Sequence, residues 1–129
     1  MTRRTDADWA ADIVAAVAAI YSHQASHRAL PDAARSSAEP MYVDALTYRL
    51  MSVGEACKNL SPEARAFGPD VPWSDIVGLR DFLAHHYHRR DPSIVVATVE
   101  HDEDLGTLLS AAAVIAGIPP ELLPVPPTP

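Results

Sequence analysis

An apolar pattern between Val43 and Leu60 constrains the fold of this chain more than any other feature. Its members, at alternating spacings of three and four residues, are Val43, Leu46, Leu50, Val53, Cys57 and Leu60. Side chains that recur about every 3.5 residues remain on one face of an α-helix. The segment therefore predicts one long helix that is packed against other helices along its whole length.

The residues before this segment predict a second helix and a loop. Thr5 followed by Asp8 has the spacing of a capping box, which predicts a helix that starts there and runs to about Gln24. The apolar face of this helix consists of Trp9, Ile13, Val17 and Ile20. Residues 31–40 contain alanine, serine, mixed charges and two prolines, so they predict a loop between the two helices.

The second half of the chain predicts a short turn, two helices and a tail. Ser61 and Pro62 open the turn, and Pro72 starts a helix that continues through Leu83. Asp91 caps a last helix that starts at Pro92 and has a glycine in its interior. The apolar side of that last helix comprises Ile94, Val95, Val99, Leu105, Leu108 and Leu109. Because six of the twelve prolines follow position 118, we expect a helical domain of residues 1–118 and an extended or disordered tail of residues 119–129.

Composition supports a single all-α domain, a bundle of four to five helices. The chain has 129 residues, and hydrophobic residues make up 48% of it but aromatic residues only 6%. Its apolar runs are shorter than the roughly 20 residues that span a bilayer, and no signal-peptide pattern precedes them. We therefore expect a cytoplasmic protein. The one cysteine, Cys57, lies on the apolar stripe and is expected in the core rather than in a redox or zinc site.

Cations gather in one segment of an otherwise acidic chain. Ten Lys and Arg stand against seventeen Asp and Glu, a net charge of −7. Between Arg80 and Asp91 three arginines and two aspartates give +1, which leaves seven cations and fifteen acids, or −8, elsewhere. Three of the six histidines lie in the same segment. A general attraction to nucleic acid is therefore not expected, but a small anion site is.

The residue types in this segment suit metal-independent RNA cleavage. The guanidinium of Arg80 can stabilise charge on a phosphate, and the imidazole of His85 can exchange a proton with the ribose 2′-hydroxyl or the leaving oxygen. On one straight helix Arg80 and His85 would project about 140° apart, whereas Arg80 and Tyr87 would project within about 20°. Either the helix ends near His85, or two copies of the chain share the site across a two-fold axis. We favour the shared site.

The same cationic segment also fits a helix cap or a metal site. Arginine and histidine stabilise the C-terminus of a helix, so the segment can be a cap, with Arg89 and Arg90 bound to carbonyl groups. His86 and His88 could join His85 in a metal site, although no acidic pattern accompanies them. Earlier in the chain, His23 and His27 have metal-ligand spacing as well, again with no acid nearby in sequence.

Residues 80–87 read "RDFLAHHY", an arginine followed after four residues by a histidine and then, two positions on, by a tyrosine. This pattern matches the R-x4-H-x-Y motif of the HepT-like toxins, a branch of the HEPN superfamily of helical nucleases, and the chain resembles that family. The blocks "YRLMSVGEACKNLSPEAR" and "VPWSDIVGLRDFLAHHY" resemble the family's second-helix segment and the segment that leads into the motif. The resemblance covers Tyr48 to about Leu109.

This resemblance implies a HEPN-like helical bundle that forms a two-fold dimer. It implies that Arg80 and His85 of both subunits line a cleft and act as an endoribonuclease without a metal or other cofactor. It also implies a type II or type VII-like toxin–antitoxin system whose antitoxin is a nucleotidyltransferase of the MNT type. Such an antitoxin can transfer AMP to the motif tyrosine, here Tyr87, which would place negative charge beside Arg80.

Several neighbouring residues are candidates for supporting roles. Arg49 and Glu55, in the second-helix block, are candidates for support of the motif, with a surface salt bridge as the alternative. The remaining candidates for support or RNA contact are Asp81, His86, His88, Arg89 and Arg90. His86, the cations after Tyr87 and the proline-rich tail depart from typical relatives. Besides the nuclease, two hypotheses remain: a non-catalytic module that docks a nucleotidyltransferase, and a helical dimer in which the motif only caps a helix.

Overall fold

The computed structural model describes residues 3–85, 91–100 and 103–128, and all the regular structure in these ranges is helical. No strand occurs in these ranges, which confirms the all-α class. The elements are α1 (Asp6–Arg28), α2 (Asp32–Asn59), α3 (Pro62–Arg65), α4 (Trp73–His85), α5 (Pro92–Glu100), α6 (Glu103–Ala116) and a short 3-10 helix, η2 (Pro120–Leu122). The six α-helices exceed the expected four to five because the short turn at Pro62 is helical and the last helix is divided.

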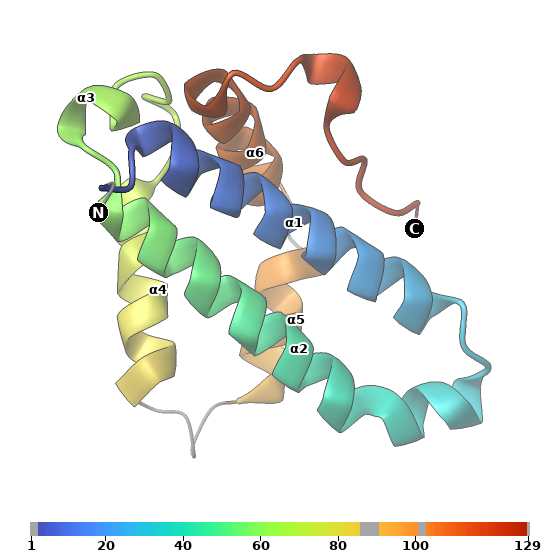
Figure 1. The fold of residues 1–129 in the computed structure, drawn as a ribbon. Coiled ribbons are helices and arrows are strands. Elements are labelled where there is room, and N and C mark those ends of the chain that lie inside the picture. The colour runs from blue at the N-terminus through green and yellow to red at the C-terminus, as the bar shows by residue number, and fades with distance from the viewer. Residues whose placement is uncertain (1–2, 86–90, 101–102, 129) are drawn as a thin grey trace.

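The two long helices α1 and α2 lie side by side as an antiparallel pair (Figure 1). Helices α4 and α5 pack on α2, and α6 packs on α1. The stripe from Val43 to Leu60 forms the centre of this core, with every member at most 4% exposed. Burying such side chains stabilises the fold by about 1.5–3 kcal/mol each relative to exposure. The prediction of a long helix packed along its length is confirmed.

The start of α1 is fixed by the predicted capping box. The backbone N–H of Thr5 donates to Asp8 Oδ2 at 2.9 Å, and the N–H of Asp8 donates to Thr5 Oγ1 at 3.2 Å. Asp6, in the first turn, accepts hydrogen bonds from the backbone N–H and the hydroxyl of Ser61, at 2.9 and 2.6 Å. These bonds lower the pKa of the Asp6 carboxyl below its ordinary value of 3.8 and join α1 to the N-terminus of α3.

The prediction of a loop over residues 31–40 is wrong. Helix α2 begins at Asp32 and includes Pro40 in its interior. Alanine, arginine and glutamate in this stretch have good helix propensity, and contacts with α1 hold its first turns. The His27 ring stacks on Tyr42 with centroids 3.9 Å apart, and His27 Nε2 lies 3.0 Å from Glu39 Oε2. These tertiary contacts outweigh the hydrogen bond that Pro40 cannot donate.

The prediction of one last helix is also wrong, because α5 ends at Glu100 and α6 starts at Glu103. Buried Val95 and Val99 belong to α5, which packs on α2, whereas α6 packs on α1. The two segments therefore pack on different helices, which separate directions for α5 and α6 allow. The predicted cap is confirmed, since Asp91 Oδ1 accepts from the Ser93 N–H at 2.9 Å. Hydrogen bonds from Ser93 lower the pKa of Asp91.

The tail begins where Gly117 ends α6. Gly117 adopts φ 74°, and the N–H of Ile118 reaches back to the carbonyl of Ala113 at 2.9 Å, a Schellman closure that favours glycine. After η2 the tail is extended and returns along α1 (Figure 1). Arg28 Nη1 donates to the carbonyls of Pro127 and Thr128, at 3.4 and 3.2 Å. Within the described ranges no helix has the length and apolar character needed to cross a membrane.

Candidate active site

Helix α4 carries both motif residues that the structure describes. Arg80 is partly buried where α4 faces α2, and His85 is exposed in the last turn. Because both lie on one helix, they project about 140° apart and do not approach each other. The hydrogen bonds and ion pairs of Arg80 go to two carboxylates instead.

Arg80 is neutralised on both sides of its guanidinium. Its Nη1 donates to Asp81 Oδ1 at 2.9 Å, and its Nη2 lies 3.0 Å from Glu55 Oε2. The Glu55 contact lacks the direction of a good hydrogen bond, so it is mainly electrostatic. The side chains of Arg80 and Glu55 are 30% and 45% exposed, so the pair is worth at most about 1 kcal/mol. A phosphate that binds Arg80 has to compete with these carboxylates.

Gly54 explains how α2 and α4 come close enough for this arrangement. A Cβ placed on Gly54 would lie 2.1 Å from Arg80 Cβ and 2.8 Å from Arg80 Cγ. No side chain fits at that position, so the glycine sets the separation between the helices and the place from which Arg80 projects. The sequence pattern marked Gly54 only as part of a family block, and this role was missed. A glycine inside a long packed helix was the available signal.

A groove of about 480 Å³ starts at Arg80 and lies between α1 and α2. Three of the residues singled out from the sequence, Arg80, Glu55 and Arg49, share this groove. The complete lining is Trp9, Asp12, Ala15, Ala16, Tyr48, Arg49, Met51, Ser52, Glu55, Ala56 and Arg80. His85 is not part of it. Sequence reasoning did not identify the α1 residues of this groove, because only the packing of α1 on α2 brings Trp9 and Asp12 to this side.

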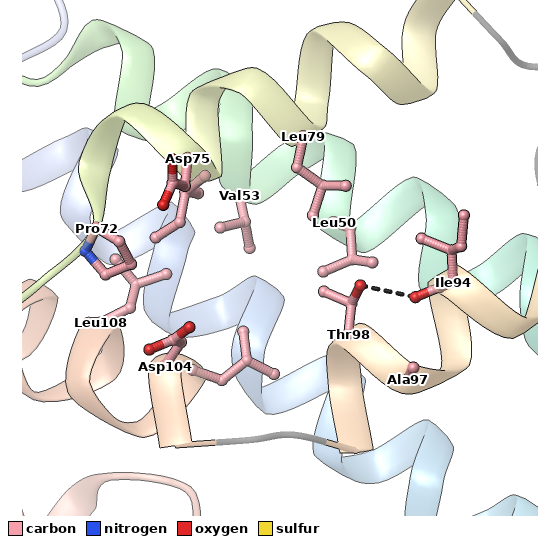
Figure 2. A pocket seen from close by; sticks show the side chains of 12 residues that line it. Leu50, Val53, Pro72, Asp75, Leu79, Ile94, Ala97, Thr98, Asp104 and Leu108 are labelled. Atoms are coloured by element: carbon pink, nitrogen blue, oxygen red, sulfur yellow. Dashed lines mark hydrogen bonds between the residues drawn. The ribbon is translucent and has the colours of Figure 1, made fainter.

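A second cavity, of about 440 Å³, lies on another side of α4 and is mostly apolar (Figure 2). Leu50, Val53 and Leu79 point into it, and Asp75 and Asp104 lie near one end beside Pro72 and Leu108. No motif residue lines this cavity. Neither a cation that could bind a phosphate nor an aromatic side chain is among the described residues that line this cavity. The groove beside Arg80 has both, so it is the candidate site.

The family of the chain follows from its match to a family model described as ribonuclease HepT-like, which covers residues 16–112. The chain belongs to the HepT-like ribonuclease family. The matched range contains the whole R-x4-H-x-Y motif and most of both helices that bound the groove.

Three relatives resemble part of this HepT-like chain. A protein of Caldanaerobacter subterraneus subsp. tengcongensis named as a candidate RNase is 38% identical over 61 residues, 47% of this chain and 54% of the relative. A protein of Thermococcus cleftensis named as a candidate ribonuclease HepT is 34% identical, and one of Methanocaldococcus jannaschii named as a candidate RNase is 36% identical. Each of these two alignments covers 39% of this chain and 46% of the relative. The chain thus spans about half the length of these relatives, and no solved structure matches it.

The end of the HepT-like motif and the three cationic residues after it lie outside the described residues. These residues are His86 and Tyr87 of the motif, followed by His88, Arg89 and Arg90. The roles expected for them, including modification of Tyr87, therefore stay predictions. Among the residues with described positions, no three His, Cys, Asp or Glu side chains gather as metal ligands would. His27, half of the histidine pair on α1, is instead engaged by Glu39 and Tyr42.

Proposed function

We propose that this protein is the toxin of a type II or type VII-like toxin–antitoxin system and cleaves RNA as a metal-independent endoribonuclease. The observation that carries the proposal is the HepT-like family match across residues 16–112, together with the motif pair Arg80 and His85 inside it. The relatives named as RNases support the same activity.

The proposed reaction uses the two motif side chains in different roles. His85 is exposed, as a group that must reach substrate has to be, and imidazole titrates near neutrality. It takes the proton of a ribose 2′-hydroxyl, and the 2′-oxygen forms a bond to phosphorus while the bond to the 5′-oxygen breaks. The leaving oxygen receives a proton, and the products are a 2′,3′-cyclic phosphate and a 5′-hydroxyl. Arg80 stabilises the charge that builds on the phosphate oxygens.

A two-fold dimer would complete this site. Arg80 and His85 lie on one helix but face different directions, so a single chain does not present both to one phosphate. Two copies of α4 that meet across a symmetry axis would place the arginine of one subunit near the histidine of its partner. This geometry supports the proposal that two subunits share the catalytic site.

Inactivation of the toxin would act at Tyr87, two positions after His85 in the sequence. In the proposed system a nucleotidyltransferase antitoxin neutralises the toxin, and its chemistry on Tyr87 joins the phenolic oxygen to the α-phosphorus of ATP and releases pyrophosphate. The attached phosphate would bring negative charge near Arg80 and repel RNA. The cations Arg89 and Arg90, with His86 and His88, would contact RNA or dock an acidic partner.

A second candidate function has one observation in its favour. Arg80 is already paired with Glu55 and Asp81, and these three groups together carry a net charge of −1. A chain in which this pairing is permanent would not bind a phosphate and would serve as a non-catalytic module that docks the nucleotidyltransferase.

RNA cleavage by the purified protein in EDTA tests the proposal. We expect cleavage by the wild-type protein and none by Arg80→Ala or His85→Ala. Arg35→Ala is a matched control, because Arg35 also pairs with a carboxylate, that of Asp32 at 3.1 Å, but lies far along α2 from Arg80. Activity retained in both motif variants would refute the assignment. A wild-type protein that cleaves no RNA, arrests no growth and still co-purifies with the antitoxin would favour the docking module.

A further inference from the structure

The groove beside Arg80 contains an exposed aromatic side chain that no packing requirement explains. Tyr48 lies on α2 and is 64% exposed, whereas the neighbouring stripe of α2 is buried. The guanidinium of Arg49 lies over the Tyr48 ring, 5.3 Å from its centroid. An exposed ring with an adjacent cation is the arrangement on which unpaired nucleic-acid bases stack.

The spacing of residues along α2 connects the Tyr48 ring to Arg80, the residue proposed to bind the phosphate. Tyr48, Ser52 and Glu55 follow at spacings of four and three, so they form one row on the helix surface. Glu55 is the residue that contacts Arg80. Seven residues of helix separate Tyr48 from Glu55 by about 10 Å, a span of about three stacked nucleotides at roughly 3.4 Å each. A strand held at Arg80 therefore reaches Tyr48.

The opposite wall of the groove comes from α1 and leaves room for a planar group. Ala15 and Ala16 provide small side chains there, and the Trp9 ring lines the same groove with the guanidinium of Arg4 4.3 Å from its centroid. The volume of about 480 Å³ falls in the range of sites that bind small organic groups.

The charges in the groove favour a base over a phosphate chain. Asp12 and Glu55 lie in it together with Arg49 and Arg80, so its carboxylates balance its cations. A track for the RNA backbone would need an excess of positive charge. The balanced, partly aromatic lining instead suits an uncharged base, with the phosphate next to it at Arg80.

We propose that this groove is a base-binding subsite for single-stranded RNA, in which a nucleotide near the scissile phosphate stacks on Tyr48. The inference rests on the proposed ribonuclease function and adds the form of the substrate, an unpaired strand. A duplex would not fit, because its bases are stacked on each other and unavailable to the ring.

Binding of a short single-stranded RNA, measured by fluorescence anisotropy in a His85→Ala background, tests the subsite. We expect Tyr48→Ala to weaken binding by about 5- to 150-fold, as loss of one stacked base does, and Tyr48→Phe to retain most of the affinity. Phe67→Ala is the matched control, since Phe67 is 65% exposed but lies outside the groove lining, and it should bind as the parent does. If Tyr48→Ala binds the RNA as tightly as Phe67→Ala does, the proposed base subsite is refuted.

Two further readouts separate stacking from other roles of Tyr48. The slope of log affinity against log salt should be unchanged in Tyr48→Ala but smaller by about one in Arg80→Ala, because only the arginine replaces a counterion. Sedimentation should show the same oligomeric state for Tyr48→Ala and the parent. A variant that loses binding only because its subunits separate would identify the groove as an interface between copies and would refute the base subsite.

Failure of the proposed function gives a different pattern. If wild-type protein cleaves RNA and the motif variants do not, but Tyr48→Ala is normal in binding and cleavage, the function stands and the subsite is wrong. If the wild-type protein neither binds nor cleaves RNA, both are wrong.

Discussion

Substitution of Gly54 by alanine tests whether close contact between α2 and α4 sets the position of Arg80. The added Cβ would lie 2.1 Å from Arg80 Cβ, whereas carbon atoms rest at about 3.5–4.0 Å. The helices would have to separate by roughly 1.5 Å, because the obstructing atoms are next to the Arg80 backbone and not at the end of a flexible side chain. Overpacking of this kind costs about 1–3 kcal/mol.

Gly78→Ala on α4 provides the matched control. An added Cβ at Gly78 meets no atom within 4 Å. Both substitutions gain about 1 kcal/mol from the better helix propensity of alanine, so that gain cancels in the comparison. The free energy of unfolding of Gly54→Ala should therefore be about 1–3 kcal/mol below that of Gly78→Ala.

Urea denaturation measures this difference directly. We expect the midpoint to fall in Gly54→Ala and to rise in Gly78→Ala, with the same dependence on urea concentration in both. Cleavage activity should fall in Gly54→Ala alone, because only there does Arg80 move. Equal stability of the two variants would show that α2 and α4 do not pack as closely as the contact at Gly54 indicates.

Three further predictions concern the carboxylates and the thiol. Glu55→Gln removes a negative charge that competes with the RNA phosphate for Arg80, so KM for RNA cleavage should fall. It also removes a contact that supports Arg80, so kcat should fall, and an unchanged kcat would exclude a positioning role for Glu55. The lowered pKa of Asp6 stabilises the fold above pH 3.8, its ordinary value, and this contribution is lost as the pH falls further. The difference in melting temperature between wild type and Asp6→Asn should therefore shrink below that pH, and a difference independent of pH would contradict the Ser61 bonds. Burial raises the pKa of the Cys57 thiol to about 12, so iodoacetamide should modify Cys57 only in denatured protein, and rapid labelling of the native state would contradict its burial.

The sequence predicted the elements whose signals are local. The stripe from Val43 to Leu60 identified α2, and Thr5, Ser61 and Asp91 marked helix starts that the structure confirms. These signals depend on residues within a few positions of each other, so no knowledge of distant contacts was needed.

The errors arose where distant contacts decide the structure. Residues 31–40 resemble a loop, but His27 on α1 binds Glu39 and stacks on Tyr42, and so it holds this stretch in α2. The division between α5 and α6 likewise depends on which helix each one packs against.

The candidate site could be predicted only in part, for the same reason. The motif identified Arg80 and His85, and the family blocks suggested Glu55, which the structure places against Arg80. Neither Gly54 nor Tyr48 could be assigned a role, because the closeness of Gly54 to Arg80 and the groove beside Tyr48 exist only after the helices have packed.

A mixed dimer tests the central claim, that Arg80 and His85 of two subunits form one ribonuclease site. Arg80→Ala and His85→Ala subunits are co-expressed with different affinity tags, and the dimer that carries both tags is isolated. If the site is shared, the His85→Ala subunit supplies Arg80 and its partner supplies His85, so one intact site remains and RNA cleavage in EDTA reappears. Each single-variant dimer should be inactive. A mixed dimer as inactive as the two parents, with the wild-type dimer active, would contradict a shared site.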